Sequence, residues 1–163
     1  MLTRRLMFMT LALVGRGREG LRVELYWATE CPIAGRYVPE VKRMMERHGD
    51  VVFEFWFPEE GLTEARLERW KGEYGVKGAA ARRDEGAGRA RRAGARMTPE
   101  AVVWMGERVV YRGRIDDRYV GWGKAKGAPE RRDVEEVIAA WRAGREMKMR
   151  EARGYGCVIE GVK

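Results

Sequence analysis

The sequence predicts an α/β fold with a mixed β-sheet, and three observations carry this prediction. Residues 22–28 alternate between apolar and polar side chains, the pattern of a strand with one buried face. From Pro32 the apolar residues change to helical spacing, and the apolar run 51–57 then indicates a second, central strand. Further along, two apolar segments flank Gly106-Glu107, a pair suited to a two-residue hairpin turn. Strands that alternate with helices favour parallel pairing, and the hairpin adds an antiparallel pair.

The first helix is expected to begin at Pro32, because proline is favoured in the first turn of a helix. It should end at the polar turn His48-Gly49-Asp50, and Pro39 inside it predicts a kink. Its apolar face consists of Ile33, Tyr37, Val41, Met44 and Met45.

A second helix is predicted over residues 63–74, where its start and stop signals are both present. Thr63 can cap its N-terminus, and Leu62 and Leu67 can form a hydrophobic staple across that end. Gly75 is placed to end the helix.

The remaining elements are shorter. Residues 77–96 are expected to hold a short edge strand and a short helix, and the hairpin strands are predicted at 101–105 and 108–115. A last helix begins at Asp133, which is expected to cap it, and a polar tail follows over 145–163.

Length and composition favour one domain, predicted over residues 21–144, between an N-terminal segment 1–20 and the tail. The chain has 33 Lys+Arg against 25 Asp+Glu, a net charge of +8 that favours acidic partners or membrane surfaces. Two arginines precede an apolar run at 6–14, which is the length of a signal-peptide core but too short to span a bilayer. We therefore expect an extracytoplasmic or periplasmic protein. The alternatives are that this segment is an uncleaved N-terminal extension or a buried strand of a cytoplasmic protein. If it is uncleaved, it is the only part of the chain expected to contact a membrane.

Cys31 is one of two cysteines and the first candidate for chemistry. It follows a strand and precedes Pro32, so its sulfur is expected at the N-cap, where free N–H groups and the helix dipole favour a thiolate. The carboxylate of Glu30 opposes this effect, and Arg36 one turn into the helix can offset it. The alternative is that Cys31 is a small buried apolar residue.

The segment from Trp27 to Ala34, with the sequence WATECPIA, resembles the Trp-Ala-x-x-Cys-x-x-Cys active site of thioredoxins. Pro39 stands where thioredoxins have a helix-kinking proline, and Met97-Thr98-Pro99 is similar to their cis-proline loop. The helix at 63–74 resembles the redoxin branch, which includes alkyl hydroperoxide reductase/thiol-specific antioxidant and TlpA-like proteins. The resemblance implies a thioredoxin-like, three-layer α/β/α fold with Cys31 as nucleophile. It also implies a substrate groove formed by Trp27, Pro32, Thr98 and Pro99.

Two positions depart from these families. Ala34 replaces the second cysteine of the motif, and Ala28 stands where peroxiredoxins carry a threonine. A second sulfur must then come from elsewhere, and Cys157 in the tail is the candidate resolving thiol. The flanking Gly154 and Gly156 would permit a close approach. The alternatives are a structural disulfide to Cys31 or an unrelated thiol on a disordered tail.

The leading hypothesis is therefore a thiol–disulfide oxidoreductase that acts on protein or small-molecule thiols and disulfides. A non-catalytic thioredoxin-like binding module and a thiol peroxidase that acts on peroxides are the alternatives. No cofactor, metal or nucleic-acid partner is expected, and the oligomeric state stays open. His48 is expected at a helix C-terminus, the arginines of 82–96 on a solvated face, and 112–123 in an ion-paired turn or a partner-docking loop.

Overall fold

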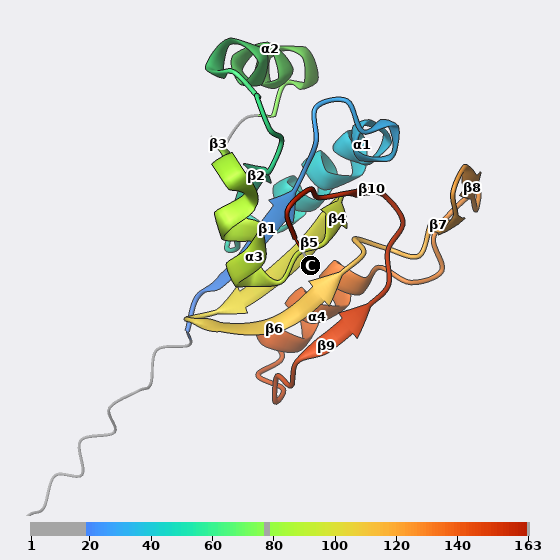
Figure 1. Cartoon of the computed structure of the whole chain (residues 1–163). Helices are drawn as coiled ribbons and strands as arrows, with labels where there is room; N and C mark the ends of the chain where they lie inside the picture. Colours follow the sequence, from blue (N-terminus) through green and yellow to red (C-terminus); the bar gives the residue numbers. More distant parts are fainter. Residues whose placement is uncertain (1–18, 77–78, 163) are drawn as a thin grey trace, which may run out of the picture.

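The computed structural model describes residues 19–76 and 79–162, and its centre is a mixed β-sheet. Six described strands lie in the order β3-β2-β1-β5-β6-β9 (Figure 1). Their bounds are Leu21–Tyr26 for β1, Val52–Phe57 for β2, Ala80–Arg83 for β3, Glu100–Met105 for β5, Arg108–Gly113 for β6 and Arg150–Ala152 for β9. β1 pairs in parallel with β2 and antiparallel with β5, so the predicted mixed sheet is confirmed.

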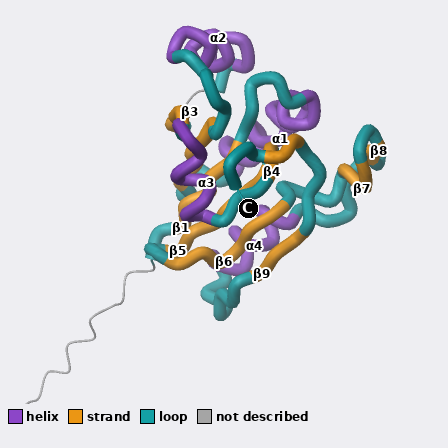
Figure 2. The backbone as a smooth tube through the Cα atoms, viewed as in Figure 1, coloured by secondary structure: helices purple, strands orange, loops and turns teal. Residues whose placement is uncertain are grey.

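Helices cover both faces of this sheet, which gives the expected three layers (Figure 2). α1 (Pro32–Arg47) and α4 (Asp133–Arg142) pack on the face that carries Val23 and Leu25 of β1. The neighbouring Tyr26 points to the opposite face, where it packs against the alanines of α3 (Gly88–Ala93). The strict alternation along β1 therefore assigns each side chain to its layer.

The second helix forms with the signals that its sequence contains. α2 spans Glu64–Tyr74, and the Thr63 hydroxyl caps it by accepting a hydrogen bond from the Arg66 N–H at 3.3 Å. Gly75 ends it in the left-handed region at φ 57°, where glycine has no steric penalty. Downstream, β3, the 3₁₀ turn Glu85–Ala87 and α3 confirm the edge strand and short helix predicted for residues 77–96.

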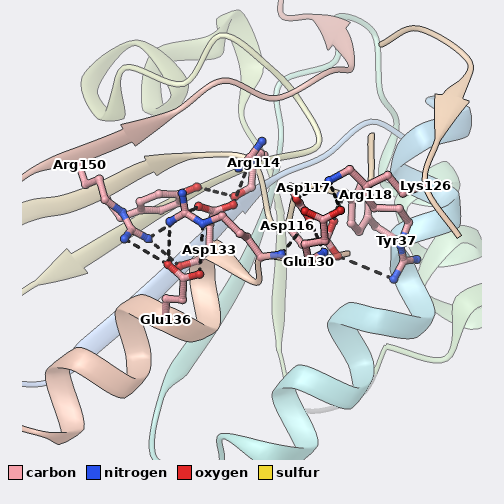
Figure 3. Close-up of polar contacts among 12 residues, drawn as sticks. Tyr37, Arg114, Asp116, Asp117, Arg118, Lys126, Glu130, Asp133, Glu136 and Arg150 are labelled. Carbon is pink, nitrogen blue, oxygen red and sulfur yellow. Dashed lines mark hydrogen bonds and ion pairs between the residues drawn. The ribbon is translucent and has the colours of Figure 1, made fainter. Parts of the chain in front are cut away.

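The capping role predicted for Asp133 is wrong. Arg132 occupies the N-cap of α4, and Asp133 is the first helical residue, with its carboxylate turned to the core. There its Oδ2 accepts a hydrogen bond from Arg114 Nε at 2.7 Å (Figure 3). A buried carboxylate needs a paired cation, and Arg114, at the end of the hairpin, supplies it.

The segment after the hairpin, residues 112–123, was expected to be either an ion-paired turn or a partner-docking loop, and the structure shows an ion-paired turn. Asp117 accepts hydrogen bonds from the Glu130 and Arg131 N–H groups at 2.8 and 2.9 Å and from Lys126 Nζ at 2.7 Å (Figure 3). The Arg131 N–H and the Lys126 ammonium lower the pKa of Asp117 to about 2. A small antiparallel ribbon of β7 (Tyr119–Gly121) and β8 (Lys124–Ala125) lies between Asp117 and Lys126 in the sequence.

The polar tail returns to the body of the domain. β9 pairs in parallel with β6 at the edge of the sheet, and β10 (Cys157–Val158) pairs antiparallel with β4 (Met97–Thr98) (Figure 1). Gly113 allows the first contact, because a Cβ there would collide with the Ala152 carbonyl. The predicted domain limits stay a prediction, and of the predicted signal peptide or N-terminal extension over residues 1–20, residues 1–18 lie outside the described part. None of the described helices is long and apolar enough to cross a membrane.

We expect Tyr37→Phe to lower the free energy of unfolding by about 1–2 kcal/mol. The Tyr37 hydroxyl donates to Asp116 Oδ1 at 2.5 Å and ties α1 to the ion-paired turn, so the change removes one of the two hydrogen bonds that this buried oxygen accepts and leaves only the Arg118 N–H at 2.9 Å. Urea unfolding followed by tryptophan fluorescence measures the loss. Tyr155→Phe is the control, because no hydrogen bond involves the Tyr155 hydroxyl in the described part of the chain. An equal effect of the two changes would contradict this assignment.

Candidate functional site

Cys31 lies at the N-cap of α1, as the sequence predicts. β1 ends at Tyr26, and Cys31 adopts an extended conformation (φ −74°, ψ 114°) immediately before Pro32 starts the helix. Its sulfur makes no capping hydrogen bond to the described helix amides. The thiol instead donates to the Thr98 carbonyl oxygen at 3.1 Å, and the side chain is only 3% exposed. The predicted position is thus confirmed, but the expected sulfur–amide contact is not present.

Thr98 is the residue at which both cysteines meet. The Thr98–Pro99 peptide bond is cis, as the resemblance to the cis-proline loop implies. The Thr98 carbonyl accepts the hydrogen bond from the Cys31 thiol, and Thr98 also lies opposite Cys157 in the β4–β10 register. Gly156 permits this approach, because a Cβ at that position would collide with the Thr98 carbonyl. Cys31 and Cys157 are therefore brought together although 125 residues separate them in the chain.

Cys157 is a partly exposed thiol that holds its proton firmly. Desolvation is the largest effect, and together with a hydrogen bond to Cys31 and the charge of the Cys31 thiolate it raises the pKa of Cys157 to about 11. Both cysteines are free. At neutral pH Cys157 is thus a protonated thiol.

The other residues expected in the groove differ in their exposure. Pro32 is exposed at the start of α1. Trp27 is fully buried, with its ring edge-on to Phe55 at 5.3 Å, so it supports the strand end from within the core and not from the groove surface. A substrate contact by Trp27 or Pro32 stays a prediction.

The partner of Glu30 is Arg66, which the sequence analysis did not single out. Arg66 Nη2 lies 2.9 Å from Glu30 Oε1 and 3.1 Å from Thr29 Oγ1. Thr29 is held in turn by Glu59, which accepts its N–H at 2.6 Å and its hydroxyl at 2.9 Å. Arg36 is exposed on α1, and its proposed electrostatic role stays a prediction. Because α2 carries Arg66 back to the β1–α1 loop, only tertiary structure reveals this pair.

The described residues hold no cluster of three or more His, Cys, Asp or Glu side chains suited to a metal ion. His48 lies at the C-cap of α1, as expected, where its Nε2 is 3.3 Å from Glu135 Oε1. A pocket of about 280 Å³ opens beside Cys157 and Thr98. The site therefore consists of two sulfurs, one backbone carbonyl and an adjoining pocket.

We expect Cys31→Ala to lower the pKa of Cys157 from about 11 toward its ordinary value of 9.0. The change removes the hydrogen bond and the negative charge but leaves burial, so the fall is partial. The pH dependence of iodoacetamide alkylation measures it. Cys31→Ser, which keeps a hydrogen-bonding group without the thiolate charge, should give an intermediate value. A pKa that stays at about 11 in the alanine variant would show that burial alone sets it.

No protein-family model and no curated protein matches the chain, whereas several solved structures do. An uncharacterized conserved protein from Geobacillus kaustophilus superposes with a TM-score of 0.74 at 19% identity, over 87% of this chain and 77% of that one. A thioredoxin-like protein from Aeropyrum pernix gives 0.57 at 13%, over 77% and 80%. A secreted Mycobacterium tuberculosis disulfide oxidoreductase homologous to E. coli DsbE gives 0.50 at 11%, over 77% and 81%. The helix-start cysteine, the cis-proline loop, the mixed sheet and these likenesses together show that the chain has the thioredoxin fold.

Proposed function

We propose that the protein is a thiol–disulfide oxidoreductase whose reacting pair is Cys31 and Cys157. One observation carries the proposal. The Thr98 carbonyl oxygen accepts a hydrogen bond from the Cys31 thiol, and Thr98 is also the residue opposite Cys157 in the β4–β10 pair. Two sulfurs brought from distant segments to one backbone position support disulfide exchange between them, because exchange needs a thiolate that can reach a disulfide sulfur.

The proposed reaction has two exchange steps. The Cys31 thiolate attacks a substrate disulfide, forms a mixed disulfide with one half and releases the other half as a thiolate. The Cys157 thiolate then attacks the Cys31 sulfur, forms the Cys31–Cys157 bond and releases the second half. The substrate gains two electrons and the protein loses two, so an external dithiol must reduce the pair before the next cycle.

The pKa of Cys157 gives these steps an order. Before the first step Cys157 stays protonated, so it does not compete as nucleophile. Once Cys31 is in a mixed disulfide it carries no charge, and two of the three causes that raise the Cys157 pKa are gone. The resolving thiol therefore becomes easier to ionise when its reaction is due.

Access to Cys31 requires movement of β10. Cys31 is 3% exposed and lies under the β4–β10 pair, whereas β10 is only two residues long and its Val158 is 75% exposed. So short a strand separates from its neighbour at little cost compared with the sheet. We propose that β10 opens for substrate and returns with Cys157. The M. tuberculosis structure is described as a secreted disulfide oxidoreductase, which supports both this chemistry and an extracytoplasmic location.

We expect the two cysteine variants to fail at different steps. With 2-hydroxyethyl disulfide, the reduced wild type should end as the Cys31–Cys157 disulfide. Cys157→Ser should stop as a mixed disulfide on Cys31, and Cys31→Ser should react at least about tenfold more slowly. Intact mass and peptide mapping of quenched samples identify each species. A Cys31→Ser variant that reacts as fast as the wild type would remove Cys31 from its role.

We expect Gly156→Ala to slow closure of the Cys31–Cys157 bond about tenfold, because the added Cβ pushes the tail off the Thr98 carbonyl. Gly49→Ala is the matched control, since an added Cβ there meets no atom within 4 Å. The conversion of mixed to internal disulfide is followed by mass in quenched time points. Equal closure rates in the two variants would mean that docking of the tail does not control resolution.

The burial of Cys31 favours a second candidate, a non-catalytic module in which the same bond is a structural staple. In the chain-entropy model a disulfide that closes so long a loop contributes about 4–5 kcal/mol. The reduction potential separates the two: a value well below about −300 mV indicates a staple, and a higher one indicates a working pair. A parallel assay with hydrogen peroxide tests the peroxidase alternative.

A further inference from the structure

The pocket beside Cys157 has a wall of negative charge in a chain whose net charge is +8. Its volume is about 280 Å³. Apart from Cys157, its ionisable lining residues are Glu30, Glu59, Glu60, Glu160 and Arg66. Four carboxylates thus share the space with a single guanidinium group, which reverses the sign of the charge found over the whole molecule.

Two of these carboxylates are available to a ligand. Arg66 lies against Glu30 at 2.9 Å and Glu59 at 3.9 Å, and so offsets part of their charge. Glu60 and Glu160 are exposed and have no ion pair in the described part of the chain. Glu60 follows β2 and Glu160 follows β10, so the free charges reach the pocket from separate segments.

Thr98 supplies an independent sign that the pocket receives a polar group. Thr98 is 3% exposed and is one of the residues that line the pocket, yet no described residue forms a hydrogen bond with its Oγ1. A buried hydroxyl without a partner is costly, and a ligand that donates a hydrogen bond would remove that cost. An ammonium or guanidinium group has several donors and no acceptor, so it suits a hydroxyl oxygen surrounded by carboxylates.

We propose that this pocket, assembled when β10 returns, favours mixed disulfides on Cys31 whose substrate half carries a positively charged group next to the sulfur, and so speeds their conversion to the Cys31–Cys157 bond. The volume lies just below the usual range for whole ligands, so it suits one side-chain-sized group. Cys157 lines the pocket, which places that group beside the sulfur pair. The inference rests on the proposed function, because the selected compound undergoes the same two exchange steps and gains the same two electrons.

The experiment compares three small disulfides of different charge: cystamine, 2-hydroxyethyl disulfide and 3,3′-dithiodipropionate. Each is mixed with reduced wild type and with the double variant Glu60→Gln/Glu160→Gln, and formation of the Cys31–Cys157 bond is followed by intact mass. Comparing variant with wild type for each compound cancels intrinsic reactivity. The matched control is Glu107→Gln/Glu146→Gln, which removes the same charge at two exposed positions outside the pocket, one in the β5–β6 turn and one between α4 and β9.

We expect the double variant to react about three- to tenfold more slowly with cystamine, faster with the dianion and unchanged with the neutral compound. Added salt should shrink the difference, because both charges are exposed. The control pair should leave all three rates unchanged. A disulfide peptide flanked by lysines, run beside cystamine, identifies the source of the charge: selectivity for both assigns a polypeptide substrate, and for cystamine alone a small molecule.

Failure of the inference is distinguishable from failure of the proposed function. If the neutral disulfide oxidises the Cys31–Cys157 pair while the double variant shows no charge-dependent change, the pocket does not select cations and the oxidoreductase proposal survives. If none of the disulfides reacts at Cys31, both proposals fall together.

Discussion

The hydrogen bond from the Cys31 thiol to the Thr98 carbonyl is the contact on which the site depends. It joins the start of α1 to β4, and β4 in turn holds β10. Loss of this contact would separate the sulfur from the only segment able to bring a second sulfur to it. Side-chain identity matters little at this junction, because the acceptor is a backbone oxygen that any residue at position 98 would present. What the sequence must provide is the chain path, and Gly156 provides it by leaving room where the tail crosses Thr98.

The central strands and helices were predictable because their signals are local. The alternation along β1, the proline before α1 and the caps of α2 each act over a few residues. β9 and β10 have no such signal, since they are three and two residues long and gain their order from β6 and β4. The same reason explains the error at Asp133: a capping residue and a buried ion-pair partner look identical in sequence until Arg114 is known to lie beside it.

The site was predictable only in part. The sequence located Cys31, the cis-proline loop and the candidate Cys157, but the partner of Glu30 lies one helix away at Arg66. The arginine cluster shows the same limit. Arg82 and Arg89 both lie over the Trp56 ring, 5.6 Å from its centroid, and Arg89 also pairs with the fully buried Glu24. Most of the arginines in this stretch are exposed, so the predicted solvated face is confirmed, but the aromatic ring beneath Arg82 and Arg89 comes from another strand and could not be identified from the arginine-rich sequence.

Ala34 explains why the second sulfur cannot come from α1 itself. The residue is fully buried in the core cluster, on the face of the helix that packs against the sheet. With that position occupied by alanine, a resolving thiol would have to come from outside the helix, and Cys157 on β10 is the candidate. The buried Cys31 thiol is bonded to β4, the strand with which β10 pairs, so under the proposed function the segment that brings the resolving thiol also limits access to Cys31. A substrate and β10 cannot occupy the edge of β4 together, because a strand edge pairs with one partner at a time. Under the proposed function, sterics alone therefore fix the sequence of events: the tail leaves, the substrate exchanges at Cys31, and the tail returns to close the bond.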